Sequence, residues 1–199
     1  MMAESIAKTV YAFTARKLYE ILHQQNDSMQ KASLANLRRG VGRKPGELPE
    51  IWGELLESMP ESLMNPLGEP SKAEWAVYTA ITLFAVHQQG HDVKNEPMHV
   101  ENVRFGTAVA RLVETDDDRT RITNRFNMAA TATEMTELSH HMRGLITLMR
   151  GMAIPFDYAS LAEDIYHYQF EEARARVRLR WGQDFYKELN KGREEDKDE

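Results

Sequence analysis

The 199-residue sequence contains no cysteine, and this absence removes several kinds of chemistry at once. Disulfides, thiolate nucleophiles and cysteine-ligated zinc or iron–sulfur sites are all excluded. No apolar run approaches the roughly 20 residues that span a bilayer, and the start MMAESIAKTV lacks a basic region followed by an apolar one. We therefore expect a protein that stays in the compartment where it is made, the cytoplasm.

The common nucleotide-binding and hydrolase motifs are missing as well. The sequence has no G-x-x-x-x-G-K-[ST], no G-x-G-x-x-G and no G-x-S-x-G, so it offers neither a phosphate-binding loop nor a serine nucleophile elbow. The run Asp116 to Asp118 resembles a magnesium cluster, but acidic residues in a row are typical of a helix start. The sequence therefore offers none of these common catalytic motifs, and we expect it to use no cofactor.

Helix signals, in contrast, are present almost everywhere. Hydrophobic residues make up 42% of the chain and charged residues 28%, as in a globular protein. Apolar residues recur at three- and four-residue spacing, which predicts an all-α fold of about eight helices. The predicted helices are 4–25, 28–39, 49–59, a helix that Ser71 and Glu74 open and Gly90 ends, 100–114, a helix opened by Asp116 to Asp118, 135–149 and 158–189.

We expect these helices to form two helical bundles joined by a short linker. The linker is HDVKNEP, residues 91–97, because it interrupts the helical pattern. The N-terminal bundle, residues 1–92, carries a basic turn, and the C-terminal bundle, residues 98–190, has four helices. Residues 191–199 form a charged tail that is too polar to fold.

One segment of the last predicted helix has an ambiguous pattern. In ARARVRLRW, residues 173–181, arginine alternates with apolar residues, as in a strand. A wider window shows apolar residues at three- and four-residue spacing from Phe170 to Leu189, which favours a helix. The four arginines then divide between two flanks and do not form one cationic face. We expect their stems to cover the apolar stripe.

Positive charge is concentrated in the stretch KASLANLRRGVGRKPG, residues 31–46. It holds five basic and no acidic residues in a chain of formal net charge -6, so the other residues sum to -11. Interactions between exposed charges fade over about 10 Å at ordinary salt, so the distant acidic residues repel a polyanion at this stretch only weakly. The stretch is therefore suited to bind a polyanion locally. The alternative is a solvated helix end, since cations such as Arg38 and Arg39 are favoured near a helix C-terminus.

Short motifs follow one another in an order that resembles a known family. They are A-x-L-R-R-G at 35–40, L-P-E-I-W at 48–52, HQQG at 87–90, N-R-F at 124–126, L-x-x-x-M-R-G-L-I-x-L-x-R at 138–150, F-D-Y-x-x-L-A-x-D at 156–164 and W-G-Q-D-F-Y at 181–186. This series is similar to the CasB family, the small subunit of the type I-E CRISPR Cascade complex. The resemblance covers most of residues 30–187.

The resemblance implies a non-enzymatic subunit of an RNA-guided surveillance complex in antiviral defence. Its partners would be the other Cascade subunits, the guide RNA, the target DNA and a second copy of itself, arranged head to tail. It would bind nucleic-acid backbone and hold the displaced non-target strand, so that the R-loop persists. Because an RNA–DNA hybrid and the DNA duplex it replaces are nearly equal in energy, such contacts can decide the balance.

Eight basic residues are the candidate nucleic-acid-binding site. The residues at the family's basic positions are Arg38, Arg39, Arg125 and Arg143. Charge and proximity add Arg43, Lys44, Arg121 and Arg150. We expect them to follow phosphates along a groove, with sequence left to base pairing. The acidic total predicts weak binding by the isolated protein and strong dependence on neighbouring subunits.

Two other classes of function stay open. A helical protein–protein adaptor would use the basic turn to dock on an acidic partner. A carboxylate-bridged metal enzyme would use Glu137 with His140 and Asp164 with His167, each spaced as in helical di-metal sites. That site needs further inward carboxylates from two more helices, and no obvious pair is present. We therefore expect surface or capping histidines and no metal.

Overall fold

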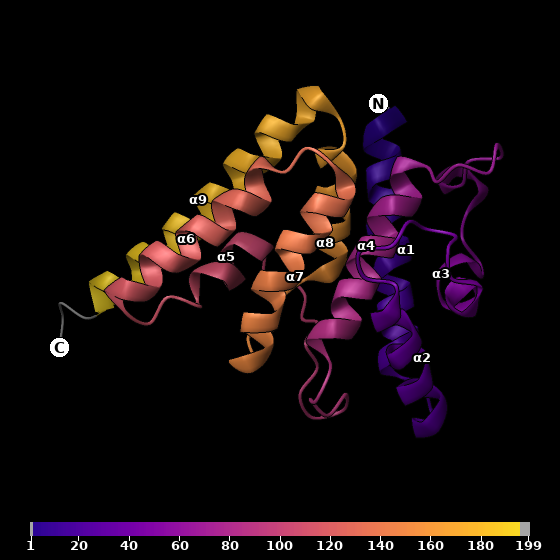
Figure 1. Cartoon of the computed structure of the whole chain (residues 1–199), viewed down its shortest axis with the longest axis horizontal. Coiled ribbons are helices and arrows are strands. Elements are labelled where there is room, and N and C mark those ends of the chain that lie inside the picture. Colours follow the sequence, from indigo (N-terminus) through magenta and orange to yellow (C-terminus); the bar gives the residue numbers. More distant parts are fainter. Residues whose placement is uncertain (1, 196–199) are drawn as a thin grey trace.

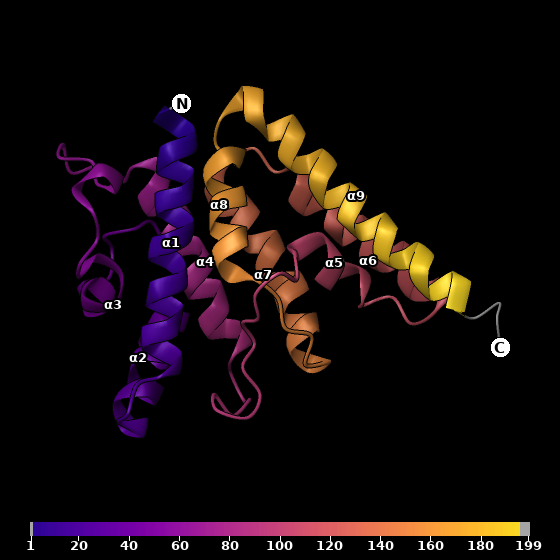
Figure 2. The ribbon, with the colours of Figure 1, turned by 180° about the vertical axis from the view of Figure 1, so that it is seen from behind.

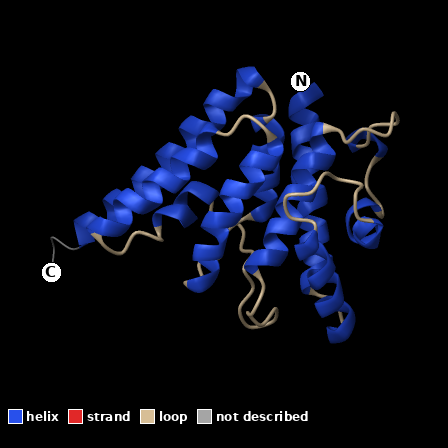
Figure 3. Cartoon of the chain, in the orientation of Figure 1, coloured by secondary structure: helices blue, strands red, loops and turns tan. Residues whose placement is uncertain are grey.

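The computed structural model describes residues 2–195, with side chains from residue 4 to residue 191. In this range the chain is helical and has no strand, apart from one bridge between His99 and Phe156 (Figure 3). The predicted all-α fold is confirmed. The elements are α1 (Met2–Leu22), α2 (Asp27–Arg39), η1 (Pro49–Ile51), α3 (Trp52–Leu56), η2 (Glu61–Leu63), α4 (Lys72–His87), α5 (Phe105–Ala110), α6 (Asp116–Thr131), α7 (Met135–Gly151), α8 (Tyr158–Tyr168) and α9 (Glu171–Glu195). Over residues 2–195 no helix has both the length and the apolar character that crossing a bilayer requires.

The long helices lie in two layers. Helices α4, α6 and α7 are in front in Figure 1, whereas α1, α8 and α9 are in front when the molecule is seen from behind in Figure 2. Helix α4 contacts α1 and α2 as well as α7 and α8. One continuous hydrophobic core therefore extends from Val10 and Leu37 to Phe126 and Trp181. The division into bundles of residues 1–92 and 98–190 stays a prediction.

Two helix starts form as the sequence predicts. Ser71 Oγ accepts a hydrogen bond from the N–H of Glu74 at 2.9 Å, and the Glu74 carboxylate accepts one from the N–H of Ser71 at 2.6 Å. This capping box satisfies N–H groups that have no partner within α4. Asp157 caps α8 by accepting a hydrogen bond from the N–H of Ser160 at 2.9 Å.

Two other helices begin slightly earlier than predicted. Asn26, rather than Ser28, caps α2, because its Oδ1 accepts hydrogen bonds from the N–H groups of Ser28 and Met29 at 3.0 and 3.1 Å. Thr115 caps α6 and forms a capping box with Asp118. Asp116 to Asp118 therefore lie in the first turn, where negative charge is favoured by the helix dipole.

The predicted helix over 100–114 is wrong, because only Phe105–Ala110 is helical. The preceding backbone pairs with the segment before α8 instead: the N–H of Val100 donates to the carbonyl of Phe156 at 3.2 Å, and the N–H of Asp157 donates to the carbonyl of Val103 at 2.7 Å. The carbonyl of Val103 is a group that a helix over 100–114 would use for its own hydrogen bonds. Tertiary pairing therefore outweighs the local helical pattern.

The single predicted helix over 158–189 is divided at Gln169 and Phe170 into α8 and α9. Lys72 holds the turn, since its Nζ donates to the carbonyl of Gln169 at 3.0 Å and lies 3.8 Å from the centre of the Phe170 ring. Helix α9 then runs diagonally along one edge of the molecule and ends at Glu195 (Figure 2). Residues 191–195 of the predicted tail are thus helical, and residues 196–199 lie outside the described residues.

The predicted helix over 49–59 is also shorter in the structure. A turn of 3-10 helix at Pro49–Ile51 leads into α3, which ends at Leu56. Ser58 follows with a φ of 60°, a left-handed conformation that a helix cannot contain. Arg16 holds this turn by donating from Nη2 to the carbonyl of Ser58 at 2.8 Å.

Candidate nucleic-acid interface

Arg38 and Arg150 come together although they are far apart in the sequence. Arg38 is in the last turn of α2 and Arg150 is in the last turn of α7, and both helices pack against α4. Partial burial, followed by the charge of Arg150, lowers the pKa of Arg38. Gln89 positions Arg150, because its Oε1 accepts a hydrogen bond from Nη1 at 3.0 Å. Two guanidinium groups that repel each other in this way are suited to share an anion.

Arg143 and Arg125 extend the positive charge across α7 and α6. Arg143 is exposed and precedes Arg150 by seven residues, so both lie on the same side of α7. Their separation along the helix axis is about 10 Å at 1.5 Å per residue. Arg125 reaches from α6 toward the same helix, since its Nη1 lies 3.7 Å from the position that a Cβ on Gly144 would occupy.

We call Arg125, Arg143, Arg150 and Arg38 the cationic track: Arg125 lies beside Gly144 of α7, Arg143 and Arg150 are on one side of α7, and Arg150 is close enough to Arg38 to affect its charge. Helices α6 and α7 both belong to the layer in front in Figure 1. None of the four arginines makes an ion pair within residues 4–191. The track is thus available to an external anion.

The other four predicted residues have different surroundings. Arg43 is exposed in the turn that follows α2. The remaining three are in surface ion pairs: Arg39 with Glu50 at 3.4 Å, Lys44 with Glu69 at 2.6 Å and Arg121 with Asp118 at 2.6 Å. Exposed pairs of this kind contribute only about 0–1 kcal/mol. A phosphate can therefore replace the carboxylate at small cost, but these residues are less available than the track.

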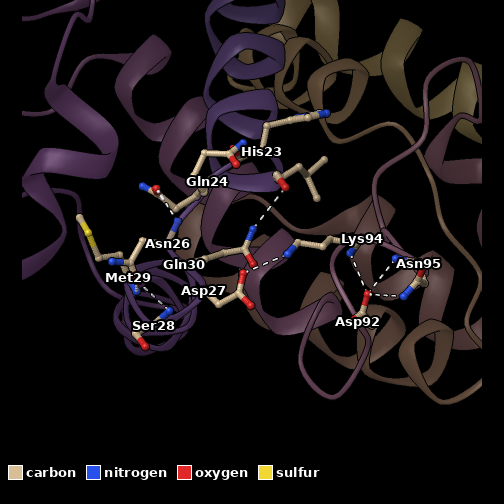
Figure 4. A network of polar contacts seen from close by, with 12 residues as sticks. His23, Gln24, Asn26, Asp27, Ser28, Met29, Gln30, Asp92, Lys94 and Asn95 are labelled. Atoms are coloured by element: carbon tan, nitrogen blue, oxygen red, sulfur yellow. Dashed lines mark hydrogen bonds and ion pairs between the residues drawn. The ribbon is translucent and has the colours of Figure 1, made fainter.

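A groove of about 330 Å³ lies beside the track, between α2 and the loop that follows α4. Lys31 and Arg38 line one wall and Lys94 lines the other. Figure 4 shows Lys94 reaching toward Asp27 at the start of α2, with 3.1 Å between Nζ and Oδ1. The sequence does not mark Lys94 as a candidate site residue, because it lies in the predicted linker and belongs to no motif.

His91 ties the same loop to the end of α7. Its Nδ1 is 3.0 Å from the carboxylate of Glu96, and its Nε2 is 2.9 Å from the carbonyl oxygen of Arg150. Asp92 stabilises the loop further by accepting a hydrogen bond from the N–H of Lys94 at 3.0 Å (Figure 4). The wall of the groove and the backbone of Arg150 are therefore held together.

Three arginines of α9 make contacts within the fold. Arg174 donates from Nε to the carbonyl of Tyr168 at 2.9 Å, and Arg178 donates from Nη2 to the hydroxyl of Tyr168 at 3.3 Å. Arg180 pairs with the buried carboxylate of Asp164. Burial raises the pKa of Asp164, and Arg180 opposes that rise. The helix predicted for ARARVRLRW is confirmed.

The residues considered for a metal site make other contacts. Trp181 donates from Nε1 to Oδ2 of Asp164 at 2.6 Å, while Arg180 binds the other oxygen. Glu137 accepts a hydrogen bond from the N–H of Thr133 at 3.0 Å and faces His141. Over the residues with described side chains, no three His, Asp or Glu residues are grouped as metal ligands.

Fold and site together define a class: an all-helical protein with an acidic total charge and one concentrated cationic track. The model of the family named CRISPR-associated protein Cse2 matches residues 33–186, so the chain belongs to the Cse2 family. A search of curated proteins found no significant match.

Solved structures agree with this family. CasB from Thermobifida fusca is 31% identical, with a TM-score of 0.74 over 89% of this chain and 97% of that chain. CasB from Thermus thermophilus is 19% identical, with a TM-score of 0.64 over 87% and 97% of the two chains. A chain of a CRISPR RNA-guided surveillance complex is 20% identical, with a TM-score of 0.66 over 96% and 98%. The resemblance to the CasB family is confirmed.

Proposed function

We propose that this protein is a non-catalytic subunit of a type I-E CRISPR surveillance complex, Cascade, in antiviral defence. It binds nucleic-acid backbone and stabilises the R-loop by holding the displaced non-target DNA strand. The observation that carries this proposal is the cationic track, whose four arginines lie on α2, α6 and α7 of an otherwise acidic protein and make no ion pair within residues 4–191. Membership of the Cse2 family supports the assembly that the proposal requires.

The track has the chemistry that a sequence-independent strand contact needs. Guanidinium groups bind phosphate oxygens with paired hydrogen bonds, and such contacts do not depend on base identity. Base pairing with the guide RNA would supply the sequence specificity.

The acidic body explains why assembly matters. With a formal net charge of -6, the protein as a whole repels DNA, and the track acts only at short range. Neighbouring subunits, the guide RNA and a second copy of this chain placed head to tail would complete the groove. The isolated protein therefore binds a single strand weakly, and the assembled complex binds it tightly.

The test removes two track residues from the assembled complex. We expect Arg38→Ala with Arg143→Ala to leave assembly intact and to shorten the lifetime of the R-loop, measured after adding unlabelled competitor DNA. Losing two contacts to single-stranded phosphate lowers the slope of log affinity against log salt by about 1.4, at roughly 0.7 per contact.

A matched control separates local contacts from total charge. Lys8→Ala with Arg176→Ala also removes two positive charges, but these lie exposed on α1 and α9, in the other layer. The control should not change R-loop lifetime. Equal effects of the two double variants would refute the proposal. Lost assembly with unchanged DNA contacts would favour the adaptor function.

A further inference from the structure

The groove between α2 and the loop after α4 combines apolar and cationic side chains. Leu34, which is 5% exposed, and Val93 are apolar residues that line it. Lys31, Arg38 and Lys94 line the same groove. An apolar cavity of roughly 150 Å³ holds benzene, so a groove of about 330 Å³ has room for a nucleobase.

A buried amide in this groove has an acceptor without a partner. Gln30 is 5% exposed, and its Nε2 donates to the carbonyls of Ile21 and Leu22 at 2.8 and 3.2 Å. These two bonds fix which end of the amide is the oxygen. Within residues 4–191 no group donates a hydrogen bond to Gln30 Oε1. Gln30 borders this groove and the one beside α3, and Figure 4 shows its oxygen on the side of Asp27 and Lys94, which line only the first.

The positive charges of the groove are available to an external anion. Lys31 and Arg38 make no ion pair within residues 4–191. Lys94 pairs with Asp27 at 3.1 Å, but the two side chains are 65% and 63% exposed, so a phosphate can replace this carboxylate at small cost. Asp92 is the other carboxylate in the groove, and it already accepts a hydrogen bond from the N–H of Lys94 at 3.0 Å.

The groove is continuous with the cationic track. Arg38 belongs to both, because it lines the groove and lies close to Arg150. His91 connects the loop wall to the carbonyl of Arg150 at 2.9 Å. A strand whose phosphates lie on the track therefore passes the groove. An acidic peptide would match the cations alone, whereas a single strand also supplies a ring for the apolar side chains and an amino group for the free acceptor.

We propose that this groove binds one nucleotide of a single DNA strand. Lys31 and Lys94 contact the phosphate, and the base lies beside Leu34 and Val93. Gln30 Oε1 accepts a hydrogen bond from an exocyclic amino group, which cytosine, adenine and guanine have and thymine lacks. This inference rests on the proposed function, because the strand reaches the groove along the track. It adds a base preference that phosphate contacts alone cannot produce.

The experiment compares three strands of about 12 nucleotides, a length within the range of single-strand binding sites. One strand is dC, one is dT, and the third is a cytosine analogue without the 4-amino group, 2-pyrimidinone. Fluorescence anisotropy measures their affinity for the full chain at low salt. We expect the dC strand to bind about fivefold more tightly than the other two, as for one net hydrogen bond.

Gln30→Met tests the acceptor with a side chain of similar length. The ratio of dC affinity to dT affinity should fall to about one, since only the dC contact is lost. The variant also loses the donor to Ile21 and Leu22, so thermal unfolding is measured alongside. The affinity ratio is the readout because a general loosening of the fold would weaken both strands equally.

A second pair of variants tests the phosphate contacts. Lys31→Ala with Lys94→Ala should weaken the dC and dT strands equally and lower the slope of log affinity against log salt by about 1.4, at roughly 0.7 per contact. The matched control, Lys8→Ala with Lys187→Ala, removes two lysines that lie exposed on α1 and α9. It should change neither the affinity ratio nor the slope.

Four outcomes would overturn the proposal. Equal affinity of the unmodified protein for all three strands would exclude the base contact, and a dC preference that Gln30→Met retains would place that contact elsewhere. Competition by polyglutamate as strong as by the dC strand would identify an acidic peptide as the occupant. Absence of binding at low salt would exclude a nucleotide site. The R-loop lifetime of Arg38→Ala with Arg143→Ala in the assembled complex tests the proposed function separately, so the failure of either proposal is recognisable by itself.

Discussion

Replacing Gly106 with alanine tests the tight contact between α5 and α9. A Cβ on Gly106 would overlap the carbonyl oxygen of Trp181 and would lie 3.0 Å from the Cβ of Asp184. Carbon atoms pack best at about 3.5–4.0 Å. The main obstacle is the backbone of α9, which cannot rotate away as a side chain can. Helix α5 must therefore move outward and lose part of its packing.

The expected cost follows from two opposing terms. Overpacking a buried contact costs about 1–3 kcal/mol, and more when backbone must shift. Alanine recovers up to about 1 kcal/mol through its higher helix propensity. We expect a net loss of about 2 kcal/mol, which lowers the melting temperature by roughly 4–8 °C in a protein of this size.

Gly182→Ala is the matched control, because a Cβ at that position in α9 would meet nothing within 4 Å. It should gain about 1 kcal/mol from helix propensity alone. Urea and thermal unfolding of both variants measure the difference, which we expect to be about 3 kcal/mol. An unchanged or raised stability of Gly106→Ala would refute the close approach of α5 and α9.

Two further predictions concern buried polar groups. Burial lowers the pKa of His87 to about 3 from its usual 6.5, so only the unfolded chain takes up this proton between those values. The free energy of unfolding therefore falls by about 1.4 kcal/mol from pH 7.5 to 5.5. In urea unfolding, His87→Gln should lose this pH dependence, whereas the exposed control His140→Gln should keep it. Equal pH profiles of the two variants would contradict the reasoning. Tyr78→Phe leaves the carbonyl of Gly40, which accepts the Tyr78 hydroxyl at 2.8 Å, without that donor. It should destabilise by about 1–3 kcal/mol, whereas exposed Tyr186→Phe should not change the urea midpoint.

The parts of the fold that depend on neighbouring residues were predictable from sequence. The capping box of Ser71 and the cap at Asp157 need only residues three positions away, so the local sequence contains both partners of each hydrogen bond. The apolar stripe of α7, with Leu138 and Met142 buried, follows equally from helical periodicity.

The errors occurred where distant segments compete for the same backbone groups. The hydrogen bonds between residues 98–103 and the segment around Phe156 make α5 shorter than the predicted helix over 100–114, and no local sequence pattern predicts these bonds. Lys72 ends α8 by binding Gln169 across 97 positions of the chain. The apolar spacing continues through that turn, so periodicity alone extends the helix past it.

The sequence by itself determined the chemistry of this protein: helices throughout, no cysteine, an acidic total and a short basic stretch. The Cse2 family could also be recognised from sequence, because the order of its motifs can be read along the chain without the fold. Only the tertiary structure decided which cations act together. Arg38 meets Arg150 because α2 and α7 both pack on α4, whereas Arg39, its immediate neighbour, faces Glu50. Charge is a property of each residue, but the field at a surface depends on distances that folding sets.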